Sequence, residues 1–402
     1  MGFLCALSIK VGYLIQYRFA LGFILSWYSE ALSEVIKSRQ FHACIPFRVN
    51  YFGVFKVVVF NQVEFDNHEQ VVFCTDKESG LKAIIAVHNT NLGPAVGGCR
   101  MWDYANDEDA VYDVLRLSKG MTYKNAVARL PFGGGKSVII GNAKEIKSEQ
   151  LFRAFGRQLE RLNGSYYSAE DVNINCDDVA MMNKETSYVL GLEGKSGNPS
   201  PFTAYGTFLG IKAALNHQRG HQNFAGIKVA VQGLGTVAYT LCKHLSEAGA
   251  ELYVTDINQA AIDRVVNEFG ATAVGIDEIY DLDVDVYAPC ALGATINDAT
   301  IPRLKATIIA GCANNQLAQS RHGEIIREKG ILYAPDYVIN AGGIINVYYE
   351  TLPEGYSAAA SNKHVEGIFD TLTEIFARSE KEQKSTHLIA DELAQEILKN
   401  GL

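Results

Sequence analysis

The sequence predicts an α/β fold with two domains, and three observations support this prediction. The chain has 402 residues, which is more than one ordinary hydrophobic core usually serves. From about Val71 onward, short β-branched runs alternate with segments of helical spacing, as in sheets covered by helices. Residues 191–206, "GLEGKSGNPSPFTAYG", are dense in Gly, Pro and Ser, so a domain boundary is expected there.

The composition is that of a soluble globular protein, and it narrows the range of partners. Hydrophobic residues make up 48% of the chain, charged residues 20%, and the formal net charge is -9, so no basic surplus favours nucleic acid. The eight cysteines are dispersed without a C-x-x-C pair, which is typical of reduced thiols in a cytoplasmic protein. The histidines are also dispersed and no H-E-x-x-H occurs, so the sequence indicates no metal site.

Residues 1–60 have a different character from the rest of the chain. Their apolar stretch, "VGYLIQYRFALGFILSW" (11–27), is interrupted by Gln16 and Arg18, which makes it a weak candidate for a membrane span or a signal peptide. We interpret residues 1–60 as an atypical extension. One hypothesis is an incorrectly assigned start, with translation beginning near 57–63 at a non-standard codon.

The first ordered elements are expected to be two strands and a helix. "EQVVFCTD" (69–76) and "GLKAIIAVHNT" (80–90) are rich in β-branched residues and flank a short turn, so they predict a pair of strands. Residues 107–119, "DEDAVYDVLRLSK", have helical spacing and acidic residues in their first turn. Gly120 is expected to end this helix.

The same alternation continues on both sides of the expected boundary. Residues 148–162 place Leu151, Phe155 and Leu159 on one face of a helix. "GSYYSAED" (164–171) reads as a strand that delivers acidic groups at its end. Beyond the boundary, a parallel sheet covered by helices is predicted from "IKVAVQGLG", "AYTLCKHLSEAG", "AELYVTDIN", "AAIDRVVNEFG", "DVDVYAPC", "ATIIAGC" and "ILYAPDYVIN".

A dinucleotide motif follows the first strand of that sheet. "GLGTVA" (233–238) fits G-x-G-x-x-A between a strand and an amphipathic helix, where glycines let backbone amides approach a pyrophosphate. The next strand ends at Asp256, whose carboxylate can accept hydrogen bonds from ribose hydroxyls and would repel a 2′-phosphate. This predicts a Rossmann-type domain that binds NAD; the alternative is a glycine turn that only packs a helix on a sheet. The predicted cofactor residues of this motif are Gly233, Gly235, Thr236, Val237, Ala238 and Asp256.

Three glycines precede a lysine in "LPFGGGKSVIIG" (130–141). A phosphate-binding P-loop would need glycine at position 130, which is leucine here, so that interpretation fails. The glycines can instead let a backbone or a ligand approach closely beside Lys136, and room for a substrate is the favoured interpretation. A lysine in a closed apolar cleft loses proton affinity and can act as a general base. From the residues alone, a solvated loop lysine remains an alternative, and Lys124 in "MTYKNAV" remains an ordinary helical lysine.

A set of motifs in one order carries a resemblance to a known family. It consists of "GLKAIIAVHNTNLGPAVGGCRMW", "LSKGMTYKNAVARLPFGGGKSVIIG", "FRAFGRQLERLNGSYYSAEDVN", "GNPSPFTAYG", "VAVQGLGTVAYTLCKHL", "APCALGATINDATIP", "ANNQL" and "YAPDYVINAGGIINV". The set resembles the Glu/Leu/Phe/Val dehydrogenase family, and within it the leucine dehydrogenases. The resemblance covers about residues 60–402 and leaves the first 60 without a counterpart.

The resemblance implies a reaction and the residues that perform it. Hydride would leave the α-carbon of an L-amino acid for NAD⁺, and water would convert the resulting imine to a 2-oxo acid and ammonia. Lys136 is similar to the lysine that activates water, and Asp171 to the aspartate that shuttles protons. Lys124 is similar to the lysine that holds the substrate carboxylate, and Asn340 to the asparagine that orients substrate. Further implied residues are Gly97, Gly98 and Met121 at the substrate backbone, and Thr203 and Asn315 at the nicotinamide half of NAD.

The implied side-chain pocket is apolar. A charged side chain that entered it would be desolvated without a partner, at a cost of several kcal/mol. We therefore expect oxidative deamination of branched-chain L-amino acids: leucine, and also valine and isoleucine. The alternatives are a phenylalanine, valine or tryptophan dehydrogenase on the same scaffold, or a non-catalytic NAD-binding sensor. The matching pocket positions are Val96, Ala169, Ile344 and Val347.

The expected organisation completes the prediction. Residues 61–195 would form an N-terminal α/β substrate/catalytic domain, and residues 200–345 a Rossmann-type NAD-binding domain separated from it by a cleft. Residues 346–402 would form C-terminal helices that pack back towards the catalytic domain. The resemblance also implies a homo-oligomer, from dimer to octamer.

Overall fold

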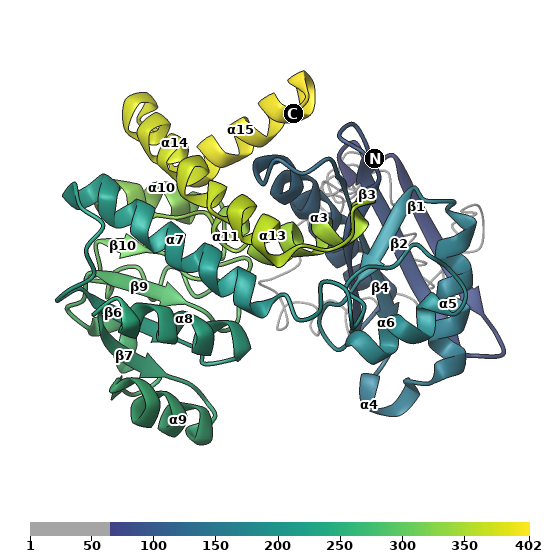
Figure 1. The fold of residues 1–402 in the computed structure, drawn as a ribbon, viewed down its shortest axis with the longest axis horizontal. Coiled ribbons are helices and arrows are strands. Elements are labelled where there is room, and N and C mark those ends of the chain that lie inside the picture. Colours follow the sequence, from purple (N-terminus) through teal and green to yellow (C-terminus); the bar gives the residue numbers. More distant parts are fainter. Residues whose placement is uncertain (1–64) are drawn as a thin grey trace, which may run out of the picture. The chain divides into compact units, whose positions relative to one another are not determined.

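The computed structural model describes residues 65–402, which contain two β-sheets with their helices (Figure 1). The interpretation of residues 1–60 lies outside the described residues. Within 65–402, no helix combines the length and the apolar character needed to cross a membrane.

The first sheet has five strands in the order β1-β2-β4-β3-β5. β1 and β2 pair antiparallel from Gln70↔Val87 to Asp76↔Leu81, which confirms the expected strand pair. β2 also runs antiparallel to β4, whereas β3 lies parallel to both β4 and β5. The elements of this half are β1 (Gln70–Asp76), β2 (Leu81–Asn89), β3 (Ala95–Trp102), α3 (Asp107–Val127), β4 (Gly133–Ile140), α4 (Ala143–Ile146), α5 (Glu149–Arg161), β5 (Tyr166–Ala169) and α6 (Cys176–Asn183).

The prediction that Gly120 ends a helix is wrong. α3 continues through Gly120 to Val127, and Asn106 caps its N-terminus by accepting from the Asp109 amide. A glycine inside a helix costs about 1 kcal/mol relative to alanine. Burial of Thr122 and other residues of the last two turns against the sheet outweighs that local preference.

The second sheet has six parallel strands in the order β11-β10-β9-β6-β7-β8. Counted from β6, this is the order 3-2-1-4-5-6 of Rossmann folds, so the predicted parallel sheet is confirmed. Its strands are β6 (Lys228–Gln232), β7 (Glu251–Thr255), β8 (Thr272–Ala273), β9 (Val286–Pro289), β10 (Ile308–Ile309) and β11 (Leu332–Tyr333). Its helices are α7 (Ser200–Arg219), α8 (Thr236–Glu247), α9 (Gln259–Phe269), η3 (Glu278–Asp281) and α10 (Arg321–Glu328).

The chain after the sixth strand is helical. These helices are α11 (Asp336–Ile339), α12 (Gly342–Tyr348), η4 (Tyr349–Thr351), α13 (Ala358–Val365), α14 (Gly367–Glu382) and α15 (Thr386–Asn400). α15 packs on α3, where Gln395 donates to the Tyr123 hydroxyl at 2.9 Å. The last helix is therefore attached to the helix that carries Lys124.

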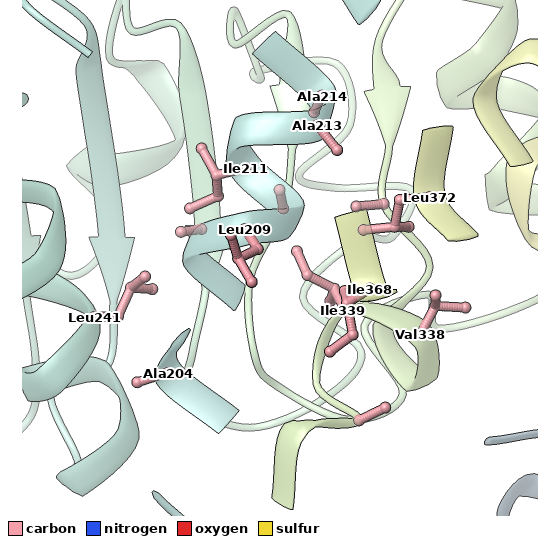
Figure 2. Packing of buried hydrophobic residues seen from close by; sticks show 14 of the residues in the cluster. Ala204, Leu209, Ile211, Ala213, Ala214, Leu241, Val338, Ile339, Ile368 and Leu372 are labelled. Atoms are coloured by element: carbon pink, nitrogen blue, oxygen red, sulfur yellow. The ribbon is translucent and has the colours of Figure 1, made fainter. Parts of the chain in front are cut away.

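α7 follows the Gly/Pro/Ser-rich segment and carries much of the core. Its N-terminus accommodates Pro201 in the first turn, where a missing N–H leaves no bond unmade. Figure 2 shows Ile339 of α11 and Leu372 of α14 on one side of α7, whereas Ile211 of α7 points to the other side. Gly210 allows the contact between α7 and α11, because a Cβ atom there would lie 2.3 Å from Ile339. α7 thus joins the Rossmann half to the C-terminal helices.

Candidate active site

Lys136 and Asp171, predicted as the catalytic pair, are in contact. Lys136 lies within β4, and Asp171 follows the end of β5 by two residues. Nζ of Lys136 lies 3.1 Å from Oδ2 of Asp171, and their side chains are 6% and 22% exposed. Burial would raise the pKa of Asp171, but Lys136 and Arg100 outweigh it and lower that pKa to about 2. The aspartate is therefore ionised at neutral pH and can accept a proton.

The three glycines before Lys136 allow a close approach of protein backbone, which confirms one of the two expectations; the favoured one, room for a substrate, is wrong. A Cβ atom at Gly133 would lie 2.0 Å from the Asn89 carbonyl, and one at Gly134 would lie 2.0 Å from the Thr122 amide. At Gly135 it would meet the Tyr166 ring at 2.6 Å. Protein atoms fill the space, and the glycines serve to bring β4 against its neighbours. They fix the position of the strand that carries Lys136.

The two glycines of β3 pack closely on the proposed site. A Cβ atom at Gly97 would lie 3.1 Å from Cγ of Met121, and one at Gly98 would lie 2.8 Å from Cβ of Asp171. Both positions therefore exclude a side chain. Residues predicted from separate motifs, Gly97 with Met121 and Gly98 with Asp171, lie next to each other.

Asn314 lies between Lys124 and Asn340. Its Oδ1 atom accepts from Nδ2 of Asn340 at 2.6 Å and lies 3.5 Å from Nζ of Lys124. Nδ2 of Asn340 also donates to the Cys312 carbonyl, whereas its Oδ1 atom is buried and has no hydrogen-bond partner among residues 65–402. A buried acceptor without a donor is costly, so this oxygen suits a donor supplied by a ligand.

Lys124 has a perturbed acidity. Burial lowers its pKa to about 8, with a further lowering by the charge of Lys136, while Asp336 and Asp171 act in the opposite direction. Its ammonium group is therefore poorly solvated near neutral pH. Such a group binds a carboxylate favourably because the ligand supplies the missing counter-charge.

The four predicted pocket residues belong to one hydrophobic cluster. Val96 of β3 and Val347 of α12 are buried within it, and Ala169 of β5 and Ile344 of α12 pack against it. Phe132 and Tyr348 of the same cluster stack edge to face at 5.4 Å. The four positions on β3, β5 and α12 therefore have apolar surroundings in the protein core.

The Gly233–Ala238 loop fits a dinucleotide. Gly233 has a positive φ of 93°, and a Cβ atom there would lie 2.6 Å from Ala291, so only glycine fits. Gly235 precedes α8 without a side-chain cap, and space beside it is open. The first N–H groups of α8 are thereby left for a phosphate. Thr236 and Val237 lie in that first turn, and Ala238 is buried beneath it.

Asp256 has an additional structural role. Its Oδ2 atom accepts from the Leu234 amide at 2.6 Å, and its Oδ1 atom accepts from the Asn258 amide at 2.7 Å. The carboxylate therefore holds the glycine loop to the end of β7. Each oxygen keeps a second lone pair for a ribose hydroxyl, so the residues present fit NAD.

The two predicted nicotinamide contacts lie in loops or at a helix start. Thr203 lies in the first turn of α7, where its Oγ1 atom would be 2.8 Å from a Cβ atom at Gly343. Asn315 has a positive φ of 53°, a conformation that asparagine tolerates better than most residues. Its neighbour Asn314 makes the bond to Asn340 described above.

Sequence reasoning missed Arg100 and Asp113. Arg100 donates through Nε to Asp171 at 3.0 Å and through Nη1 to Asp113 at 2.9 Å. Asp113 projects from α3 and also accepts from the Tyr104 hydroxyl. The signal was a lone arginine that follows Gly97 and Gly98 on an otherwise apolar strand, because such a charge needs a partner.

Two family models match the chain. Residues 68–188 match "Glu/Leu/Phe/Val dehydrogenase, dimerisation domain", and residues 253–396 match "Glutamate/Leucine/Phenylalanine/Valine dehydrogenase". A leucine dehydrogenase of Bacillus cereus is 56% identical over 341 residues, covering 84% of this chain and 93% of the relative. An L-tryptophan dehydrogenase of Nostoc punctiforme is 49% identical over 346 residues, covering 86% and 97%.

Solved structures agree with this assignment. The crystal structure of L-tryptophan dehydrogenase from Nostoc punctiforme has a TM-score of 0.75 and 48% identity, covering 85% of this chain and 99% of that one. A glutamate dehydrogenase from Thermus thermophilus, with a TM-score of 0.69 and 22% identity, shares the fold; it covers 82% of this chain and 88% of that one. The chain therefore belongs to the Glu/Leu/Phe/Val dehydrogenase family and is an amino-acid dehydrogenase that uses NAD.

Proposed function

We propose that the chain catalyses the reversible oxidative deamination of branched-chain L-amino acids, with leucine, valine and isoleucine as substrates. The observation that carries this proposal is the apolar cluster that contains Val96, Ala169, Ile344 and Val347. A carboxylate side chain placed there would lose its water without gaining a partner. Among the relatives, the leucine dehydrogenase identities of 54% to 56% support the same choice.

The proposed mechanism assigns one task to each polar group. NAD, when bound, accepts the hydride of the substrate α-carbon. Lys124 binds the substrate carboxylate through its ammonium group, and the free Oδ1 atom of Asn340 accepts from the substrate amino group. Asp171, ionised at the outset, takes a proton from that amino group and later returns it. Lys136 acts as the general base that accepts a proton from the attacking water.

The domain organisation belongs to the same proposal. Residues 61–195 would bind substrate, residues 200–345 would bind NAD, and residues 346–402 would pack back on the first of these. The contact between Gln395 and Tyr123 supports the last part. We also propose a homo-oligomer, supported by the description of the first family model as a dimerisation domain. The cytoplasmic location stays a prediction from the dispersed cysteines.

A substrate panel tests the proposed specificity. We expect NADH formation to be fastest with L-leucine, L-valine and L-isoleucine, and slower with L-phenylalanine and L-tryptophan, at equal NAD⁺ concentration. L-Glutamate should give a kcat/KM at least about a hundredfold lower, since its charge would be desolvated. Because the chain is 49% identical to an L-tryptophan dehydrogenase, L-tryptophan is the most informative alternative substrate in the panel. Preference for glutamate or tryptophan would overturn the proposed substrate class while leaving the family assignment intact.

The pKa of Lys124 predicts a pH-dependent affinity for the substrate carboxylate. Only the ammonium form attracts a carboxylate, and the pKa of this group is lowered to about 8. The dissociation constant of the 2-oxo acid of leucine, measured with NADH present and ammonia absent, should therefore rise above pH 8, by up to about tenfold per pH unit.

Two variants control the Lys124 experiment. In Lys124→Arg the dissociation constant of the 2-oxo acid should no longer rise above pH 8, because a guanidinium group stays charged. Lys119 lies on the same helix but is paired with Asp66 at 2.8 Å, so Lys119→Arg should keep the wild-type dependence. A wild-type dissociation constant that is constant from about pH 7 to about pH 9 would contradict the assigned role of Lys124.

A further inference from the structure

Arg100 links the proposed catalytic pair to a second carboxylate. It lies on β3, and its Nε and Nη1 atoms donate to Asp171 at 3.0 Å and to Asp113 at 2.9 Å. Asp113 is itself fixed by the Tyr104 hydroxyl at 2.7 Å and by Arg116 at 3.1 Å. The side chains of Arg100 and Asp113 are 20% and 14% exposed, so little water competes for these bonds. The two carboxylates therefore fix the guanidinium group at two of its edges.

The two oxygens of Asp171 differ in their surroundings. Oδ2 contacts both Nζ of Lys136 at 3.1 Å and Nε of Arg100 at 3.0 Å. In the part of the chain from 65 to 402, no donor is hydrogen-bonded to Oδ1. An oxygen that already faces two cations is a poor site for a proton. Any proton that Asp171 accepts therefore goes to Oδ1.

Arg100 does not exchange protons itself. Burial lowers its pKa, but the charges of Asp171 and Asp113 outweigh this effect and raise it above the ordinary value for arginine. The guanidinium group stays charged throughout the range in which the enzyme folds. Its contribution to the site is therefore its charge and its fixed direction.

We propose that Arg100 is a positioning residue: anchored on Asp113, it holds Oδ2 of Asp171 and leaves Oδ1 as the atom that exchanges a proton with the substrate amino group. This inference rests on the role of Asp171 given under the proposed function. It adds that the network from Asp113 through Arg100 decides which oxygen reacts and keeps the aspartate ionised against the effect of burial.

Arg100→Gln tests the inference through the pH profile. Loss of the cation should raise the pKa of Asp171, so the acid limb of the kcat/KM profile should move to higher pH, into the measurable range. The plateau kcat should fall about tenfold or more. Arg153 of α5 donates to Glu185 at 2.6 Å, and this arginine–carboxylate pair outside the site serves as the control. Arg153→Gln should keep the wild-type profile, and a wild-type profile in Arg100→Gln would overturn the inference.

A second variant and a second measurement keep the test decisive. Arg100→Lys keeps the charge but cannot span both carboxylates, so its acid limb should stay low while its kcat falls; a wild-type kcat would contradict the positioning role. Infrared spectroscopy of aspartate-labelled protein measures the protonation of Asp171 without turnover. The band of its protonated carboxyl group is assigned by its absence in Asp171→Asn. If the pH at which this band is half-formed is the same in Arg100→Gln and in wild type, the inference is contradicted. A wild-type enzyme that is inactive on all amino acids would instead contradict the proposed function alone.

Discussion

Replacing Lys136 by alanine is expected to lower kcat by about a thousandfold or more while the affinity for NADH stays within about twofold. The reason lies in its position: Nζ is 3.1 Å from Asp171, its side chain is 6% exposed, and it projects from β4 in the first sheet. The Gly233–Ala238 loop, which fits the dinucleotide, begins α8 in the second sheet. Loss of the amine should therefore affect the chemistry and spare the cofactor.

Lys136→Arg separates charge from proton transfer. Arginine keeps a cation beside Asp171 but does not give up its proton at any pH the enzyme tolerates. If Lys136 is a base, Lys136→Arg should be about as inactive as Lys136→Ala. Activity within about tenfold of wild type would instead mean that only the charge matters. Steady-state kcat and a fluorescence titration with NADH provide both readouts.

A matched control makes the result specific. Lys147 forms an ion pair with Asp178 and is hydrogen-bonded to neither Lys136 nor Asp171; its side chain is 28% exposed. Lys147→Ala should leave kcat and NADH affinity close to wild type. Loss of NADH binding in Lys136→Ala, without such loss in Lys147→Ala, would make Lys136 a cofactor residue and reject its role as a base.

Local patterns predicted the elements of the fold well. The β-branched runs at 69–76 and 80–90 and the alternation beyond 226 became the expected strands, because burial of one face imposes that spacing. Gly120 was misjudged, since the cost of a helical glycine is small compared with the packing of the two turns that follow it. Tertiary contacts, which a local sequence pattern does not contain, determine that α3 continues past Gly120.

The site was predicted in part, and the limits have a physical cause. The resemblance identified Lys136 and Asp171, and the structure brings them together. Which group approaches the glycines at 133–135 was misjudged because this depends on Thr122 and Tyr166, which are distant in sequence. Arg100 was missed because its meaning comes from two carboxylates on other elements. A charged residue on an apolar strand should prompt a search for such partners.

Asp171→Asn is expected to lower kcat by about a hundredfold to ten-thousandfold. The amide has the shape of the carboxylate but cannot accept a proton, so exchange with the substrate amino group would be lost. The change also leaves Lys136 and Arg100 without the Oδ2 charge that they share, and the midpoint of urea unfolding should fall. Asp178→Asn, which removes the partner of Lys147, is the matched control and should keep wild-type kcat.

The double variant Lys136→Ala/Asp171→Asn shows whether the two residues act as a unit. Groups that act in one proton-transfer sequence lose their effect together, so the double variant should be about as slow as the slower single variant. Independent contributions would instead multiply the two losses. Because Nζ of Lys136 directly contacts Oδ2 of Asp171, we expect the double variant to be about as slow as the slower single variant. Multiplied losses would mean that the contact between them is structural and that Lys136 and Asp171 contribute independently to catalysis.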